Sequence, residues 1–175
     1  LVPATRLLVE AVVARVVFHL RAGGVLSHFA EVSGFPGFAR AAARTLAELR
    51  MEGVALESLR ALGAAGVELA AMGEALEEEL EEARLADRAA VFASAAKVAA
   101  ADVRVASPLL GKPLLFVDVP VTTEKERALL RVLCERSPHV LATVAAGDEP
   151  SLAAFESVLG AAQGARAPED RGLLA

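Results

Sequence analysis

The sequence has no tryptophan and no tyrosine, and aromatic residues make up only 4% of its 175 residues. This scarcity argues against aromatic stacking platforms for single-stranded nucleic acid. The one cysteine is Cys134, so a disulfide within the chain and a cysteine-based zinc site are both excluded. A lone cysteine fits a reducing compartment, and we expect a cytoplasmic protein.

Long apolar runs and a signal peptide are also missing. The most apolar early stretch, residues 7–20, contains Glu10, Arg15 and His19, so we expect no membrane span and no membrane partner. The net charge is −5 and the isoelectric point is near 5.3. The chain as a whole therefore does not attract DNA or anionic lipid, although a local basic patch could still do so.

Small apolar residues, alanine above all, are abundant. Hydrophobic residues make up 55% of the chain and the mean hydropathy is +0.47, which excludes disorder for most of its length. A chain of this size can bury a core without disulfides or metal. It starts at Leu1 with no methionine, and we interpret it as an internal fragment of a larger protein.

Hydrophobic periodicity predicts a helical domain over residues 1–105. The expected helices cover residues 5–21, 25–31, 37–51, 56–62 and 67–84, with a last one from Asp87, its cap, to Val103. The first helix is apolar around nearly its whole circumference and should be buried. The last two should pair as the antiparallel helical hairpin of a bundle.

Residues 106–162 have a different pattern, which predicts a parallel βαβα unit. Two apolar runs, 114–117 and 140–144, are typical of buried parallel strands. A capping box, Thr123 to Glu126, opens a helix that reaches about residue 136, and Pro150 lies near the start of the next helix. Residues 163–175 are expected to be a flexible tail. The fold class is thus mainly α with a small α/β part.

Two aspartates should lie at the carboxyl edge of this sheet, where ligands bind in open α/β folds. Asp118 follows the first strand, and Asp148, after Gly147, follows the second. Such residues can hold Mg²⁺ or its water. The alternative, which the spacing favours, is that Asp118 starts a loop and Asp148 caps a helix. Gly111-Lys112 is not a phosphate-binding loop, because Ala106 stands where the first glycine is needed and Pro113 follows the lysine.

Five arginines are candidates for contacts with DNA phosphates. Three lie on one helix, Arg40, Arg44 and Arg50, and Arg84 and Arg88 flank a helix junction. The alternative is that they pair with carboxylates, which the acidic balance of the chain favours. The three histidines lack ligand-like spacing, and we expect neither a metal site nor a catalytic residue within the chain.

Several of these segments resemble motifs of one protein family. Residues 114–123, LLFVDVPVTT, resemble the Walker B segment of UvrD/Rep-type superfamily 1 helicases, and residues 140–148, VLATVAAGD, resemble the next motif, in which a strand runs into Gly-Asp. Three further patterns are upstream: FPGF at 35–38, AELR with a following GV at 47–54, and LADRA at 85–89. Their order and spacing resemble AddB-type subunits of bacterial helicase–exonucleases, relatives of proteins with a RecB-like PD-(D/E)xK nuclease domain.

The resemblance implies a helical 1B-like domain followed by part of a RecA-like P-loop NTPase (1A-like) domain. It also implies a DNA-handling scaffold in bacterial DNA repair and recombination, with DNA and a helicase subunit as partners of the whole protein. Mg²⁺ and ATP would bind elsewhere in that protein and not in this chain. The chain departs from the family because Val119, Val121 and Ser151 replace a catalytic Glu and two Gln residues, so it resembles an inactivated motor. Two alternatives stay open: part of an active UvrD/Rep-like helicase, and a helical protein-interaction module without a nucleic-acid role.

Overall fold

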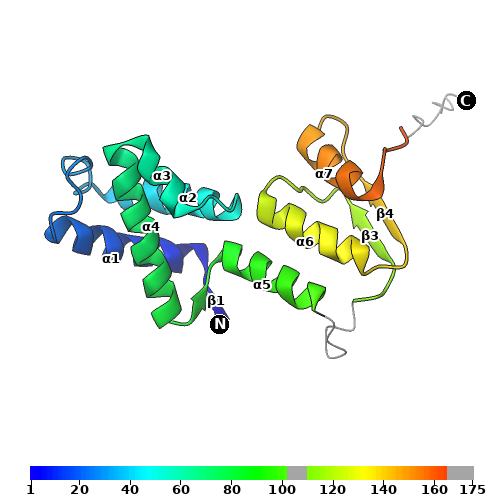
Figure 1. Ribbon diagram of the computed structural model, residues 1–175, viewed down its shortest axis with the longest axis horizontal. Coiled ribbons are helices and arrows are strands. Elements are labelled where there is room, and N and C mark those ends of the chain that lie inside the picture. Colours follow the sequence, from blue (N-terminus) through cyan, green and yellow to red (C-terminus); the bar gives the residue numbers. More distant parts are fainter. Residues whose placement is uncertain (102–109, 165–175) are drawn as a thin grey trace, which may run out of the picture.

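The computed structural model describes residues 1–101 and 110–164, which are mainly helical with two small parallel sheets (Figure 1). The helical part comprises α1 (Arg6–Ala22), α2 (Pro36–Met51), α3 (Leu56–Leu59), the 3₁₀ helix η1 (Arg60–Leu62) and α4 (Ala64–Glu82). The α/β part comprises β3 (Leu114–Val117), α6 (Glu124–Glu135), β4 (Val140–Thr143) and α7 (Glu149–Leu159), and α5 (Arg88–Ala100) lies between the two parts. The predicted class, mainly α with a small α/β part, is confirmed. Residues 102–103 of the predicted sixth helix and 165–175 of the predicted tail lie outside the described residues.

Local side-chain hydrogen bonds define where the helices begin. Asp87 caps α5 as predicted, because its Oδ1 accepts the Ala90 N–H at 2.9 Å. The predicted capping box at the start of α6 is also present, and Glu126 accepts the Thr123 N–H at 3.0 Å. These sequence signals are reliable because every group involved lies within four residues of the helix start.

The core of the helical part lies where α1, α2 and α4 meet. Its most deeply buried side chains are Val13, Leu46, Met72 and Leu76. The prediction that α1 is buried nearly all round is wrong, because only its inner side packs on α2 and α4, and Phe18 on the outer side is 68% exposed. Within the described part of the chain, neither α1 nor any other helix combines the length and apolarity needed to cross a membrane.

A buried carboxylate organises the segment between α1 and α2. Glu68 of α4 is 4% exposed and accepts three hydrogen bonds: from the Ser27 hydroxyl at 2.8 Å, the His28 N–H at 2.6 Å and the Phe29 N–H at 3.0 Å. The short helix predicted at residues 25–31 is wrong, and a succession of turns occupies this segment. The turns persist because their backbone donors are satisfied by Glu68 rather than by helical carbonyls.

The predicted hairpin of the last two helices is also wrong. After α4 the chain forms a short strand, β2 (Leu85–Ala86), which pairs in parallel with β1 (Val2–Pro3). Arg84, which precedes β2, has a φ of 53°, so the chain changes direction there. Helix α5 then packs along α6 of the α/β part rather than back along α4 (Figure 1).

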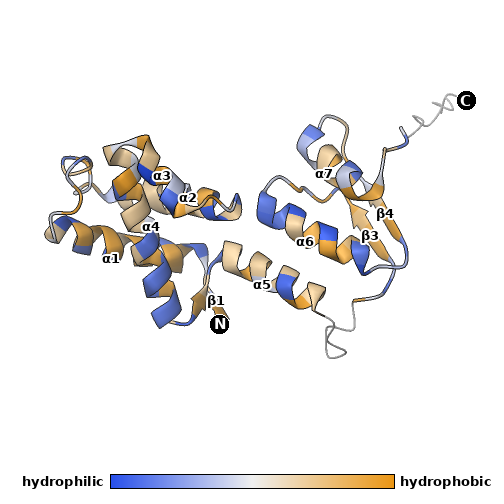
Figure 2. Ribbon diagram, in the orientation of Figure 1, coloured by the Kyte–Doolittle hydropathy of each residue, from blue (hydrophilic) through white to orange (hydrophobic). Residues whose placement is uncertain are grey.

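Strands β3 and β4 pair in parallel as predicted, with Leu114 opposite Val140 and Val117 opposite Thr143. Their inner face packs on α6 and α7, where the rings of Phe116 and Phe155 lie 5.4 Å apart. The expectation that both faces are buried is wrong. The outer face is open, and its three aliphatic side chains are each 63% exposed: Leu115, Val117 and Leu141. Figure 2 shows this apolar sheet at the edge of the molecule.

We predict that the Glu68→Gln variant is destabilised by about 2 kcal/mol at neutral pH, because one of three buried donors would face an NH₂ group and the charge-assisted bonds would be lost. The matched control is Glu78→Gln on the exposed side of the same helix, which should change stability little. Urea unfolding of the two variants checks the prediction. Equal midpoints for both would contradict it.

The same carboxylate should make stability depend on pH. Burial opposes its charged form, yet the hydrogen bonds from His28, Phe29 and Ser27 hold the pKa of Glu68 below its usual value. Because the folded pKa is depressed, the stabilisation is present above the unfolded pKa of about 4.3 and is lost as pH falls through the folded value. The stability difference between wild type and Glu68→Gln should therefore shrink in acid, and a constant difference would contradict this account.

Candidate functional site

Asp118 lies at the carboxyl end of β3, as predicted. Its φ is 51°, a left-handed conformation that few residues other than glycine adopt. Its N–H donates to the Thr143 carbonyl at 3.0 Å, and its Oδ1 accepts the Ala145 N–H at 3.1 Å. The side chain is exposed and joins the end of β3 to the segment that leaves β4.

Gly147 and Asp148 lie in the turn between β4 and α7. Gly147 has a φ of 93°, which glycine adopts without strain. Asp148 caps α7, because its Oδ1 accepts the Ser151 N–H at 3.1 Å. The contacts of Asp118 and Asp148 are thus those of the structural alternative, and a role in holding Mg²⁺ stays a prediction. Among the residues that the structure describes, no group of three or more histidine, cysteine or acidic side chains could hold a metal ion.

Ser151 is fully buried beneath this edge, a feature that sequence reasoning missed. Its hydroxyl accepts the Val121 N–H at 2.9 Å, and Val121 is itself buried. This bond fastens the loop after β3 to α7. The available signal was the spacing between Ser151 and Phe155, which places both on the inner face of a helix.

Two of the five candidate arginines, Arg50 and Arg88, form close ion pairs that join separate elements. Arg50 is 16% exposed; its Nε donates to Asp87 Oδ2 at 2.6 Å, and it also pairs with Glu77. Burial opposes its charged form, but Asp87 and Glu77 raise the pKa of Arg50 above its usual value. Arg88 donates to Glu126 at 2.6 Å, which links α5 to α6.

The other three candidates are exposed. Arg44 pairs with Glu48 at 2.9 Å along α2, and Arg40 lies 3.9 Å from Glu10 of α1. Both side chains are 76% exposed, and such pairs contribute little stability. Arg84 has no ion pair among the described residues. The interpretation that arginines pair with carboxylates holds for four of the five, and contact with DNA stays a prediction.

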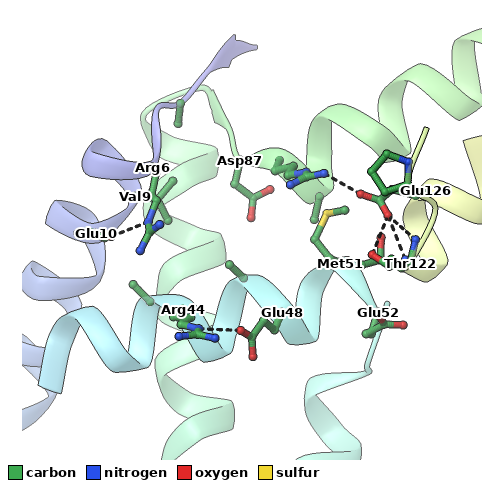
Figure 3. A pocket seen from close by; sticks show the side chains of 17 residues that line it. Arg6, Val9, Glu10, Arg44, Glu48, Met51, Glu52, Asp87, Thr122 and Glu126 are labelled. Atoms are coloured by element: carbon green, nitrogen blue, oxygen red, sulfur yellow. Dashed lines mark hydrogen bonds and ion pairs between the residues drawn. The ribbon is translucent and has the colours of Figure 1, made fainter. Parts of the chain in front are cut away.

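The structure also forms a cleft that the sequence did not predict. It has a volume of about 820 Å³ and lies between α1, α2, the start of α5 and the loop before α6 (Figure 3). Its apolar lining comprises Ala4, Val9, Ala43, Ala47, Met51, Ala89 and Pro120. Its charged lining comprises three arginines and five acids: Arg6, Arg44, Arg88, Glu10, Glu48, Glu52, Asp87 and Glu126. Acids are in excess among these residues, so the cleft as a whole does not attract phosphates, although the Arg44 side chain is itself 76% exposed.

Glu126 is the most constrained carboxylate of this cleft (Figure 3). It accepts the N–H groups of Thr122 and Thr123 at 2.9 and 3.0 Å, in addition to the bond from Arg88. Burial opposes its charge, but these donors hold the pKa of Glu126 below its usual value. Both of its carboxylate oxygens therefore already accept hydrogen bonds from groups of the chain itself.

We predict that Ser151→Ala destabilises the chain by about 2 kcal/mol, because the buried Val121 N–H would lose its acceptor. The matched control is Ser157→Ala on the same helix, since Ser157 is exposed and donates to the Ala154 carbonyl of its own helix at 2.7 Å. Thermal unfolding of the two variants measures the difference. If both variants melt like wild type, the hydroxyl does not fasten the loop.

No family model, curated protein or solved structure matches the chain. The resemblance to AddB-type subunits therefore depends on the motifs quoted from the sequence.

Proposed function

We propose that the chain is a DNA-handling segment of a bacterial helicase–exonuclease-type protein of DNA repair and recombination, of the AddB type. In this proposal the helical part is the 1B-like domain, and the α/β part is a piece of a RecA-like domain that serves as a scaffold. The chain itself is not catalytic. The whole protein acts in the cytoplasm with a helicase subunit as its partner.

The buried hydrogen bond of Ser151 is the observation that supports this proposal best. A RecA-like motor needs polar groups beside the nucleotide to activate water and to contact the γ-phosphate. At the corresponding positions Val119 and Val121 are apolar, and the hydroxyl of Ser151 is buried and bonded to the Val121 N–H. In this proposal the edge belongs to a nucleotide-binding fold, but its polar atoms bond to the backbone of neighbouring loops.

The described residues do not by themselves fit a Mg·ATP site. At the carboxyl edge of the sheet they supply Asp118, one of whose oxygens already accepts the Ala145 N–H, and Asp148, one of whose oxygens accepts the Ser151 N–H. A bound nucleotide would bring a phosphate chain and its metal, and the groups needed to hold them would have to come from a P-loop outside these residues. We therefore assign no chemical step to this edge.

Contact with DNA is supported by the exposed arginines of α2. Arg40 and Arg44 are one helical turn apart, so their guanidinium groups emerge on the same side of α2. Their partners, Glu10 and Glu48, hold them in exposed ion pairs that a phosphate could replace at little cost. We assign these two arginines to the DNA backbone. Arg50 and Arg88 are committed to pairs within the protein and act as positioning residues.

A second candidate function, a helical protein-interaction module without a nucleic-acid role, is favoured by one observation. The outer face of the β3–β4 sheet exposes Leu115, Val117 and Leu141, whereas parallel sheets are normally covered on both faces. Under this candidate, binding to a protein would be insensitive to salt and DNA would not bind. Magnesium-dependent ATP turnover that is lost in Asp118→Ala would instead favour part of an active UvrD/Rep-like helicase.

We predict that the chain binds duplex DNA with an affinity that falls steeply with salt. The Arg40→Glu/Arg44→Glu variant should bind more weakly, and the slope of log affinity against log salt should flatten by about 2, because two phosphate contacts are lost. Fluorescence anisotropy of labelled DNA at several salt concentrations measures both quantities.

The matched control is Lys97→Glu/Arg131→Glu, which changes the net charge equally at exposed positions on α5 and α6. A smaller effect of this control assigns the loss to α2. If both double variants lower the affinity equally, only overall charge matters and the assignment to α2 fails. If wild type shows no DNA binding at about 50 mM salt, the DNA-handling function itself is wrong.

A further inference from the structure

Aromatic side chains gather at the end of the helical part that lies away from α5 and α6. Four of the seven phenylalanines, those at positions 18, 29, 35 and 38, fall within this short stretch of sequence. Phe18 and Phe35 are 68% and 66% exposed, whereas the other phenylalanines are at least partly buried. In Figure 1 the turns between α1 and α2 lie beside the carboxyl end of α1, so these segments meet at one end of the molecule.

An arginine of α1 reaches the turn that precedes Phe35. Arg21 is one turn after Phe18 on α1, which places both on one side of the helix. Its guanidinium lies against Gly34, the residue before Phe35: a Cβ at Gly34 would be 2.7 Å from Nη1 of Arg21 and 3.1 Å from Cζ. Arg21 is exposed and forms no ion pair among the described residues. We call Phe18, Arg21, Gly34 and Phe35 the aromatic patch.

The stretch of sequence that contains the patch is poor in acidic residues. Between residues 11 and 40 there are three arginines and one acid, Glu31, although the complete chain has 23 acids and 18 basic residues. Of these arginines, Arg15 pairs with Glu79 and Arg40 lies near Glu10. Arg21 forms no ion pair within the part of the chain that the structure describes. His19 and His28 are exposed at the same end. The patch therefore combines two exposed rings with one exposed guanidinium that forms no ion pair among the described residues.

The patch is also held in place by the protein. Glu68 fixes the turns from residue 27 to residue 29 through three hydrogen bonds. Beneath the turns, the rings of Phe29 and Phe38 lie 5.3 Å apart, and on α1 the ring of Phe18 meets that of His19 edge-on at 5.6 Å. Ordering of the surface therefore costs little when a ligand binds.

We propose that the aromatic patch binds single-stranded DNA, with unpaired bases stacked on Phe18 and Phe35 and a phosphate held by Arg21. Exposed rings interleaved with a guanidinium are the groups that recognise unpaired bases, whose faces are hidden in a duplex. The proposal rests on the DNA-handling function and specifies the form of DNA. The low aromatic content of the chain does not exclude such a platform, because its exposed rings lie in one place.

The test uses the full chain and fluorescence anisotropy with labelled oligothymidylate and a hairpin duplex. The Phe18→Ala/Phe35→Ala variant should bind oligothymidylate about tenfold more weakly, while its affinity for duplex stays within about twofold of wild type. Gly34→Ala should also weaken binding to oligothymidylate, because its Cβ would displace the guanidinium of Arg21. The matched control is Leu115→Ala/Leu141→Ala, which removes two equally exposed apolar side chains from the β3–β4 sheet and should bind like wild type.

The outcomes separate this proposal from the function on which it rests. If the Phe18→Ala/Phe35→Ala variant binds oligothymidylate like wild type while Arg40→Glu/Arg44→Glu loses DNA, the patch proposal fails and DNA handling stands. If wild type binds no DNA, both fail. If the phenylalanine variant loses only its binding to vesicles that contain phosphatidylglycerol, the patch contacts lipid and the proposal is overturned. Circular dichroism of each variant establishes that it is folded.

Discussion

The ion pair between Arg50 and Asp87 is the contact on which the arrangement of the molecule depends. Asp87 accepts Arg50 Nε at 2.6 Å, and the same carboxylate caps α5 through the Ala90 N–H. One buried side chain therefore joins the end of α2 to the start of α5. Because α5 packs along α6, this junction positions the α/β part against the helical part and shapes the cleft between them. Removal of Arg50 would leave the buried Asp87 carboxylate without its ion pair, so the pair constrains both parts together.

The two ends of the molecule use their polar and aromatic groups in different ways. At the carboxyl edge of β3 and β4, Asp118, Asp148 and Ser151 bond to the backbone of neighbouring loops. At the opposite end, Phe18 and Phe35 are exposed, and the guanidinium of Arg21, which lies against Gly34, forms no ion pair among the described residues. In the proposed function the α/β part is thus a scaffold, and contacts with DNA come from the helical part.

Features set by neighbouring residues could be predicted from the sequence. The caps at Asp87 and Thr123 and the parallel pairing of β3 with β4 follow from short patterns. The turns held by Glu68 could not be predicted, because that carboxylate is about forty residues from its donors. The open face of the sheet could not be predicted for a related reason. An apolar run shows that a strand can be buried on both faces, but it does not show whether another element covers each face. Pairing of the arginines was expected in general, but the particular partner of Arg50 depends on the fold.

In the proposed function, DNA contacts the helical part, while the carboxyl edge of β3 and β4 binds no nucleotide. The most direct test is a pair of ¹H–¹⁵N NMR titrations of the labelled full chain, one with oligothymidylate and one with Mg·ATP. We expect oligothymidylate to shift amide signals between residues 18 and 35, and Mg·ATP to leave the signals of Asp118, Gly147 and Asp148 unchanged. Saturable shifts at those three residues with Mg·ATP, together with no change at residues 18–35 with oligothymidylate, would contradict the account.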